Sequence, residues 1–133
     1  MFAATFVLLL LGHWLADYPF QTDHQAKHKA ACGRTGWTAN LTHAATHVLL
    51  CGAALGLGAL VLDEVTLSAW PAAAALLWIG ATHGFIDRRW PVARWMRLAR
   101  QEGWAQHGGA AHVDQTAHAL ALGIAALFLA ATV

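Results

Sequence analysis

The sequence predicts an all-α polytopic membrane protein: four transmembrane helices in an up-and-down bundle, with a short amphipathic interfacial helix between spans three and four. Two observations lead to this prediction. Of the 133 residues 58% are apolar and only 11% are charged, whereas a soluble domain carries about a quarter charged residues. The apolar residues also gather in four stretches, each near the roughly 20 residues that a helix needs to cross a bilayer. The length leaves room for one domain, residues 1–133.

The four expected spans follow one another with short connections. We place them at about residues 2–20, 41–62, 70–87 and 112–133. The first stretch lacks the positively charged start and the small-residue cleavage site of a signal peptide, so we expect it to be a retained span. Neighbouring spans that are joined by short connections pack as antiparallel helices.

The charges of the connections predict the orientation in the membrane. Every lysine and arginine lies between spans one and two or between spans three and four, whereas the connection between spans two and three is acidic, Asp63-Glu64. Basic loops stay in the cytoplasm. We therefore expect a multi-pass protein of the bacterial inner membrane, with both termini outside and both basic loops cytoplasmic.

Residues 91–104 carry the pattern of a helix that lies on the membrane surface. Apolar residues, among them Val92 and Met96, recur at helical spacing, and arginines fill the positions between them. A basic amphipathic helix binds anionic lipid headgroups, so we expect the segment Arg88–Arg100 to contact such headgroups. We expect the lipid bilayer as the partner and no nucleic acid, and the sequence leaves the oligomeric state open.

Each expected span carries two ionisable residues that are four positions apart. They are His13 and Asp17, His43 and His47, His83 and Asp87, and Asp114 and His118. Ionisable side chains inside a bilayer cost several kcal/mol unless they are paired, so they usually face the bundle interior and mark functional sites. A spacing of four places both members of a pair on one helix face, about 6 Å apart along the axis.

The alternating directions of the spans place these eight residues in two layers. The three aspartates and His43 lie nearer the cytoplasm, and the other four histidines lie one turn deeper. Imidazole and carboxylate groups are ordinary ligands of zinc, iron and manganese. We therefore predict that all eight bind a divalent metal, zinc ahead of iron or manganese, and two ions ahead of one ion whose imidazole ligands are oriented by the aspartates. A bundle that is only hydrogen-bonded is the structural alternative.

The polar residues of the spans fall into three motifs. They are His13-x3-Asp17-x3-Gln21, His83-x3-Asp87 and Asp114-Gln115-x2-His118. In this order they resemble a family of small bacterial and phage integral-membrane proteins that is catalogued as a domain of unknown function. The resemblance implies that these residues, with either His43 or His47, are the polar positions that the family shares; it implies no activity. More distantly, the histidine-rich spans resemble membrane-bound metal-dependent hydrolases.

Three functions fit this pattern. We predict first a metal-dependent hydrolase that acts on a lipid-associated or phosphoester substrate near the cytoplasmic side, with Asp17, Asp87 or Asp114 as the general base. The first alternative is a transporter or sensor of a metal ion or proton, although the outward halves of the spans are almost wholly apolar. The second alternative is a haem-binding redox protein that uses the deep histidines as axial ligands.

Overall fold

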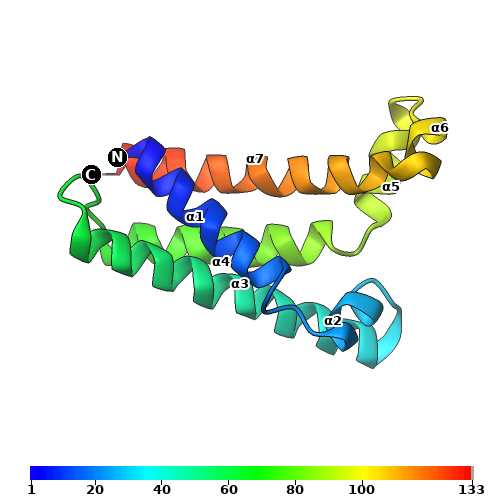
Figure 1. The fold of residues 1–133 in the computed structure, drawn as a ribbon, viewed down its shortest axis with the longest axis horizontal. Helices are drawn as coiled ribbons and strands as arrows, with labels where there is room; N and C mark the ends of the chain where they lie inside the picture. The colour runs from blue at the N-terminus through cyan, green and yellow to red at the C-terminus, as the bar shows by residue number, and fades with distance from the viewer. Residues whose placement is uncertain (133) are drawn as a thin grey trace.

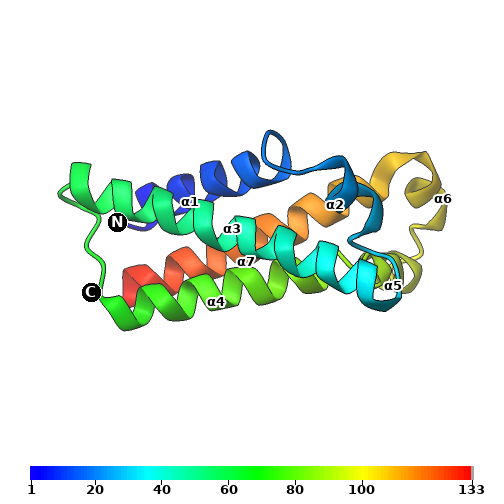
Figure 2. The ribbon, with the colours of Figure 1, turned by 90° about the horizontal axis from the view of Figure 1, so that it is seen from below.

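The computed structural model describes residues 1–132, which form helices and no strand. The elements are α1 (Phe2–Asp17), α2 (Asp23–His28), α3 (Gly33–Val61), α4 (Ala69–Ile86), α5 (Trp90–Leu98), α6 (Glu102–Trp104), the π-helical turn η1 (Ala105–Gly109) and α7 (Ala110–Ala131). The long helices α1, α3, α4 and α7 lie side by side (Figures 1 and 2). Both α1 and α4 pack against α3 and α7. Val133, the last residue of the expected fourth span, lies outside the described residues.

Within residues 1–132, three helices are long and apolar enough to cross a membrane, one fewer than the sequence predicts. They are α3, α4 and the helical stretch Glu102–Ala131 that contains α7. Helix α1 is also apolar but has 16 residues, which corresponds to about 24 Å at 1.5 Å per residue. It ends at Asp17, two residues before Pro19, which has no N–H to continue the hydrogen-bond ladder. Residues 18–20, which we expected to complete the first span, therefore lie beyond the helix.

Helices α1 and α3 cross at very short range. A Cβ atom on Gly12 would lie 2.9 Å from Cα of Cys51, which is closer than side-chain packing allows. The missing side chain of Gly12 therefore lets the two backbones approach. Because His13 follows Gly12 and His47 precedes Cys51 by one turn, the crossing brings these two imidazoles together, with 3.2 Å between their Nδ1 atoms.

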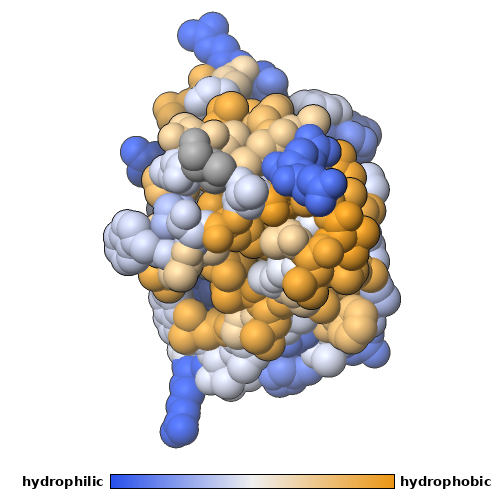
Figure 3. Space-filling model, turned by 90° about the vertical axis from the view of Figure 1, so that its left-hand side faces the viewer, coloured by the Kyte–Doolittle hydropathy of each residue, from blue (hydrophilic) through white to orange (hydrophobic). Residues whose placement is uncertain are grey.

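The interior has an apolar half and a polar half. Buried residues of the apolar half include Leu9, Leu55, Ile79 and Leu129. This half lies toward the end where both termini are found (Figure 1) and where the N-terminal ammonium lies 3.0 Å from the carboxylate of Glu64. Figure 3 looks onto this end, where hydrophobic side chains form much of the surface and polar ones lie mostly at its edges.

Both basic connections lie at the opposite end of the molecule (Figure 1). Helix α2 packs against α3, and α5 packs against α4 and α7. Helix α5 is the amphipathic helix that the sequence predicts: Val92 and Met96 are buried and pack with Ile86. It ends at Leu98 instead of continuing to Trp104, because Arg100 adopts a φ of 55° that a right-handed helix does not accommodate.

Candidate metal centre

Four imidazoles from four helices meet in the polar half. They belong to His13 of α1, His47 of α3, His83 of α4 and His118 of α7, and all are buried. The ring centroids of His47 and His83 are 3.4 Å apart, and those of His83 and His118 are 4.4 Å apart. The ring of His13 lies 4.8 to 5.4 Å from the other three. The structure thus brings together the deep layer expected from the sequence.

A second set of polar side chains lies beside these rings. Nε2 of His43 is 3.2 Å from Oδ1 of Asp17 and 3.5 Å from Oδ2 of Asp87. The same Oδ1 of Asp17 is 3.2 Å from Nε2 of His47, and the same Oδ2 of Asp87 is 3.1 Å from Nε2 of His83. The two carboxylates therefore connect the shallow set to the deep rings.

Asp114 lies apart from the other two aspartates. Its Oδ2 is 3.3 Å from Nδ1 of His118, and its side chain is 25% exposed. The side chains of Asp17 and Asp87 are only 7% and 4% exposed. Asp114 therefore lies at the edge of the cluster and not, as we expected from the sequence, inside it. Residue spacing predicts the depth of a residue along its helix, but it does not predict the distance of the side chain from the centre of the bundle.

Lys29 is a member of the cluster that the sequence analysis missed. Its Nζ lies 3.0 Å from Oδ2 of Asp87 and 3.3 Å from Nε2 of His43, and its side chain is 13% exposed. Arg88 fixes the backbone at this point, because it donates hydrogen bonds to the carbonyl oxygens of Lys29 (3.0 Å) and Ala31 (2.8 Å). The sequence signal that could have indicated this placement is the capping box at the start of α2. It predicts a helix between the first two spans, and this helix turns the chain back.

Amide side chains support the cluster. Gln115 donates a hydrogen bond to Oδ2 of Asp17 (3.2 Å), and Gln21 donates one to the backbone oxygen of Asp17 (2.6 Å). The glutamines of two separate motifs thus meet at one aspartate. Asn40, which the sequence analysis did not single out, is buried and donates to the carbonyl oxygen of Gly84 (3.0 Å). This bond joins α3 to α4 one turn from His43.

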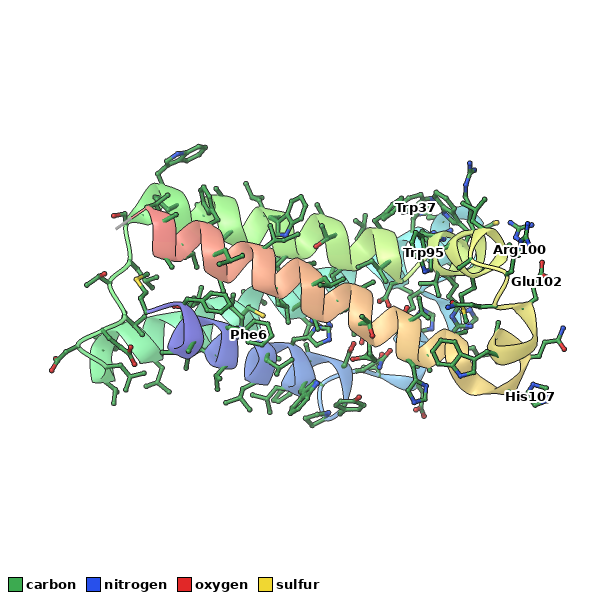
Figure 4. The ribbon with its side chains drawn as sticks, turned by 90° about the horizontal axis from the view of Figure 1, so that it is seen from above. Phe6, Trp37, Trp95, Arg100, Glu102 and His107 are labelled. Carbon is green, nitrogen blue, oxygen red and sulfur yellow. The ribbon has the colours of Figure 1, made fainter. Side chains whose placement is uncertain are left out.

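The other ionisable candidates lie outside the cluster. The remaining histidines are His24, His28, His107 and His112, all at least partly exposed. His107 lies at the far end of the molecule, the same end as Glu102 and Arg100 (Figure 4). Both cysteines are free thiols: Cys32 is exposed, and Cys51 is buried in the apolar half, where it packs as a small core residue.

The donor atoms lie close enough together to hold a metal ion. One group consists of Asp17, His43, His47 and His83, and the other of His83, Asp87 and His118; within each group the ligand atoms lie within 4.8 Å of one another. Ligands bound at about 2.0–2.1 Å to one zinc ion are roughly 3–4 Å apart. The donor atoms of either group are therefore spaced nearly as the ligands of a metal ion are, and His83 belongs to both groups.

Unpartnered nitrogens in the cluster also favour a cation. Among the described residues, three buried ring nitrogens have no polar partner: Nδ1 of His43, Nδ1 of His83 and Nε2 of His118. The other ring nitrogens of His83 and His118, and Nε2 of His13, each face one carboxylate oxygen at 3.1 to 3.3 Å. An unpartnered buried polar atom costs about 1–3 kcal/mol. A divalent ion that is bound by imidazole lone pairs would satisfy several of these atoms at once. The donor set therefore fits a metal ion both in chemistry and in spacing.

A pocket of about 670 Å³ adjoins the cluster, between α5, α7 and the end of α4. Two of the carboxylates of the cluster, those of Asp87 and Asp114, line it together with Lys29. Arg89 and Arg97 line it as well, and the remaining lining is largely apolar. The pocket therefore joins the buried carboxylates to a basic surface at the α5 end.

Comparison with curated proteins and with solved structures gives no match. One protein family matches the chain over residues 5–133, which include every residue of both ligand groups. The family relationship expected from the order of the motifs is thus confirmed. The chain belongs to the family described as protein of unknown function (DUF3307).

Proposed function

We propose that the chain is a bacterial inner-membrane protein in which α1, α3, α4 and α7 are four up-and-down spans. The short α1 packs along α3 and α7, and a short span is accommodated by local thinning of the bilayer. The acidic connection and both termini lie at one end, and both basic connections lie at the other (Figure 1). The positive-inside rule then directs the basic end, with the cluster and its pocket, to the cytoplasm.

The proposed activity is metal-dependent hydrolysis of a phosphoester whose anionic group reaches the cluster from the cytoplasmic side. The observation that carries this proposal is the pocket, because it links Asp87, a member of a ligand group, to Arg89 and Arg97. Arginines beside a cleft attract anions and bind phosphate oxygens in pairs. The metal is zinc ahead of iron or manganese, since imidazoles dominate the ligand groups.

The reaction adds one water to phosphorus and breaks the P–O bond to the alcohol. A divalent ion in the cluster would polarise a phosphoryl oxygen and make the attacking water more acidic. Asp114 is the best placed general base, because it lines the pocket, is partly exposed and is oriented by His118. It takes a proton from the attacking water and returns it to the leaving alcohol. Asp17 and Asp87 are too deeply buried for this role and act as ligands.

The two alternative functions have less support. A transporter needs a polar path across the bilayer, but beyond the cluster the described interior is apolar up to the end with the termini, apart from the hydroxyl of Thr5. A bis-histidine haem needs a slot for the macrocycle between its axial imidazoles. The deep rings are in mutual contact, with centroids 3.4 to 5.4 Å apart, and leave no such slot.

The proposal is tested with purified protein in detergent, by metal analysis and by phosphate release from phosphatidic acid. Asp114→Asn should keep the metal content, because Asp114 belongs to neither close ligand group, and should lower the hydrolysis rate about 10²–10⁴-fold. Asp23→Asn, at an exposed position on α2, is the matched control and should change neither quantity. Absence of bound metal after metal loading, or full hydrolysis by metal-free protein, would refute the proposed function.

A further inference from the structure

Lys29 has no part in the hydrolysis proposed above, yet its ammonium touches both ligand groups. It lies 3.3 Å from Nε2 of His43, which belongs to the first group, and 3.0 Å from Oδ2 of Asp87, which belongs to the second. The side chain is largely buried, and it belongs to the residue that follows α2, outside the four long helices. A cation that is part of the chain thus lies where the two groups meet.

We propose that Lys29 and a divalent metal ion compete for Nε2 of His43 and Oδ2 of Asp87. Metal binding releases the ammonium into the adjacent pocket, where Lys29, Arg89 and Arg97 together bind a phosphate group. This inference rests on the proposed metal site. It adds that metal loading creates the binding site for the anion.

The competition follows from the single lone pair of an imidazole nitrogen. Nε2 of His43 faces the first ligand group, because it also lies 3.2 Å from Oδ1 of Asp17 and 3.4 Å from Nε2 of His47. Its lone pair either accepts a hydrogen bond from the ammonium or binds an ion. An ion at zinc distance from this nitrogen would also lie within roughly 5 Å of the ammonium, where two cations repel strongly in a poorly solvated site.

The pocket offers the displaced ammonium a place nearby. Lys29 already lines it, and its backbone is held by Arg88, so only the flexible four-carbon side chain needs to move. In the pocket the ammonium joins Arg89, which has only a long 3.5 Å contact to the carbonyl oxygen of Ala26, and Arg97. Besides Asp87, two acidic residues line the pocket, Asp114 and Glu102. The three cations outnumber these two carboxylates, and the excess positive charge suits a doubly charged phosphate.

Amine labelling of the wild-type protein tests the displacement, because Lys27 and Lys29 are the chain's two lysines. Lys27 is exposed and serves as the internal control. An acetylating reagent read out by mass spectrometry should label Lys29 slowly in metal-free protein. Saturating Zn²⁺ should accelerate labelling of Lys29 at least tenfold and leave Lys27 unchanged. If zinc is bound and the rate at Lys29 stays the same, the displacement is wrong.

The second part of the proposal, the anion site, is tested by asking whether phosphate protects Lys29 from labelling. Inorganic phosphate should slow labelling of Lys29 again when Zn²⁺ is present and have no effect when it is absent. Nanodiscs of phosphatidylcholine with and without phosphatidic acid distinguish a lipid headgroup from free phosphate: protection by phosphatidic acid alone assigns the lipid. Protection by neither source, or equal protection without Zn²⁺, contradicts the coupled anion site.

Zinc titration of variants separates this inference from the proposed function. Lys29→Met should bind Zn²⁺ at least tenfold more tightly than the wild type and should lose phosphate binding, and Lys27→Met should match the wild type in both. Equal zinc affinity of Lys29→Met and wild type rejects the competition but leaves the metal site intact. Failure of the wild type to bind Zn²⁺ rejects both.

Discussion

Replacing His83 with leucine should leave the stability of the metal-free protein within about 2 kcal/mol of the wild type and remove about half of its stabilisation by metal. The side chain of His83 is 2% exposed; its Nδ1 has no hydrogen-bond partner, and its Nε2 faces Oδ2 of Asp87 at 3.1 Å. Leucine is close to histidine in size and leaves no polar atom unpaired. The substitution also keeps Asp87 paired, because Nζ of Lys29 stays 3.0 Å from its carboxylate.

The expected magnitude follows from opposing contributions. The one nitrogen without a partner, Nδ1, costs roughly 1–3 kcal/mol. The change forfeits the approach of Nε2 to Oδ2 of Asp87 at 3.1 Å, and an imperfect fit of the new side chain costs about 1.5 kcal/mol or less. A hydrogen bond to a charged group contributes about 1.5–3 kcal/mol at best geometry. The opposing contributions nearly cancel, so we expect the stability without metal to stay within about 2 kcal/mol of the wild type.

Metal binding stabilises the wild type more than the variant. At a zinc concentration 100 times the Kd, binding stabilises the wild type by about 2.7 kcal/mol. Without His83 the first group keeps three ligands and the second keeps two, and a tenfold weaker affinity reduces this gain to about 1.4 kcal/mol at the same concentration. Unfolding in detergent with and without chelator, followed by circular dichroism, measures both effects.

The matched control is His107→Leu, at an exposed position far from the cluster, which should leave both stabilities within about 0.5 kcal/mol of the wild type. A metal-free His83→Leu protein that is less stable than wild type by 2 kcal/mol or more would refute the reasoning about unpartnered nitrogens. Equal zinc stabilisation of the variant and the wild type would show that His83 is not a shared ligand.

Three further outcomes follow from the fold and the cluster. Asp17→Ala should lower the metal content of purified protein, whereas His24→Ala should not, and equal losses would mean that the cluster is not the metal site. A membrane-impermeant thiol reagent should label the exposed Cys32 only after spheroplasts are permeabilised, and labelling of intact spheroplasts would reverse the orientation. Gly12→Ala should destabilise the protein by about 1–3 kcal/mol through overpacking, because its Cβ would meet the α3 backbone at 2.9 Å; unchanged stability would contradict the tight crossing.

The sequence predicted the histidine cluster because the ionisable residues of the long helices recur at a regular spacing. Four pairs at a spacing of four residues define one face on each helix, and alternating helix directions then set the depth of each pair. These two facts are enough to bring His13, His47, His83 and His118 together. The end of α1 could also have been predicted, since Pro19 is visible in the sequence and cannot continue a helix.

The placement of Lys29 and Asp114 depends on tertiary geometry that periodicity does not contain. Lys29 reaches the cluster because α2 folds back onto α3 and because Arg88, 59 residues further along, holds its carbonyl oxygen. Asp114 has the depth of the other aspartates but lies nearer the surface, beside the pocket formed with α5. Neither contact leaves a repeat in the sequence, so both emerge only when the connections are folded.

The charge of the cluster links the number of metal ions to the presence of an anion. With neutral imidazoles, the carboxylates of Asp17, Asp87 and Asp114 and the ammonium of Lys29 leave two negative charges. One divalent ion neutralises them, and a second ion leaves two positive charges in a poorly solvated interior, where unbalanced charge is costly. A phosphate dianion in the adjacent pocket reduces this excess positive charge. We therefore expect the two-ion state predicted from the stacked layers to form together with the bound phosphate, and the one-ion state to prevail without it.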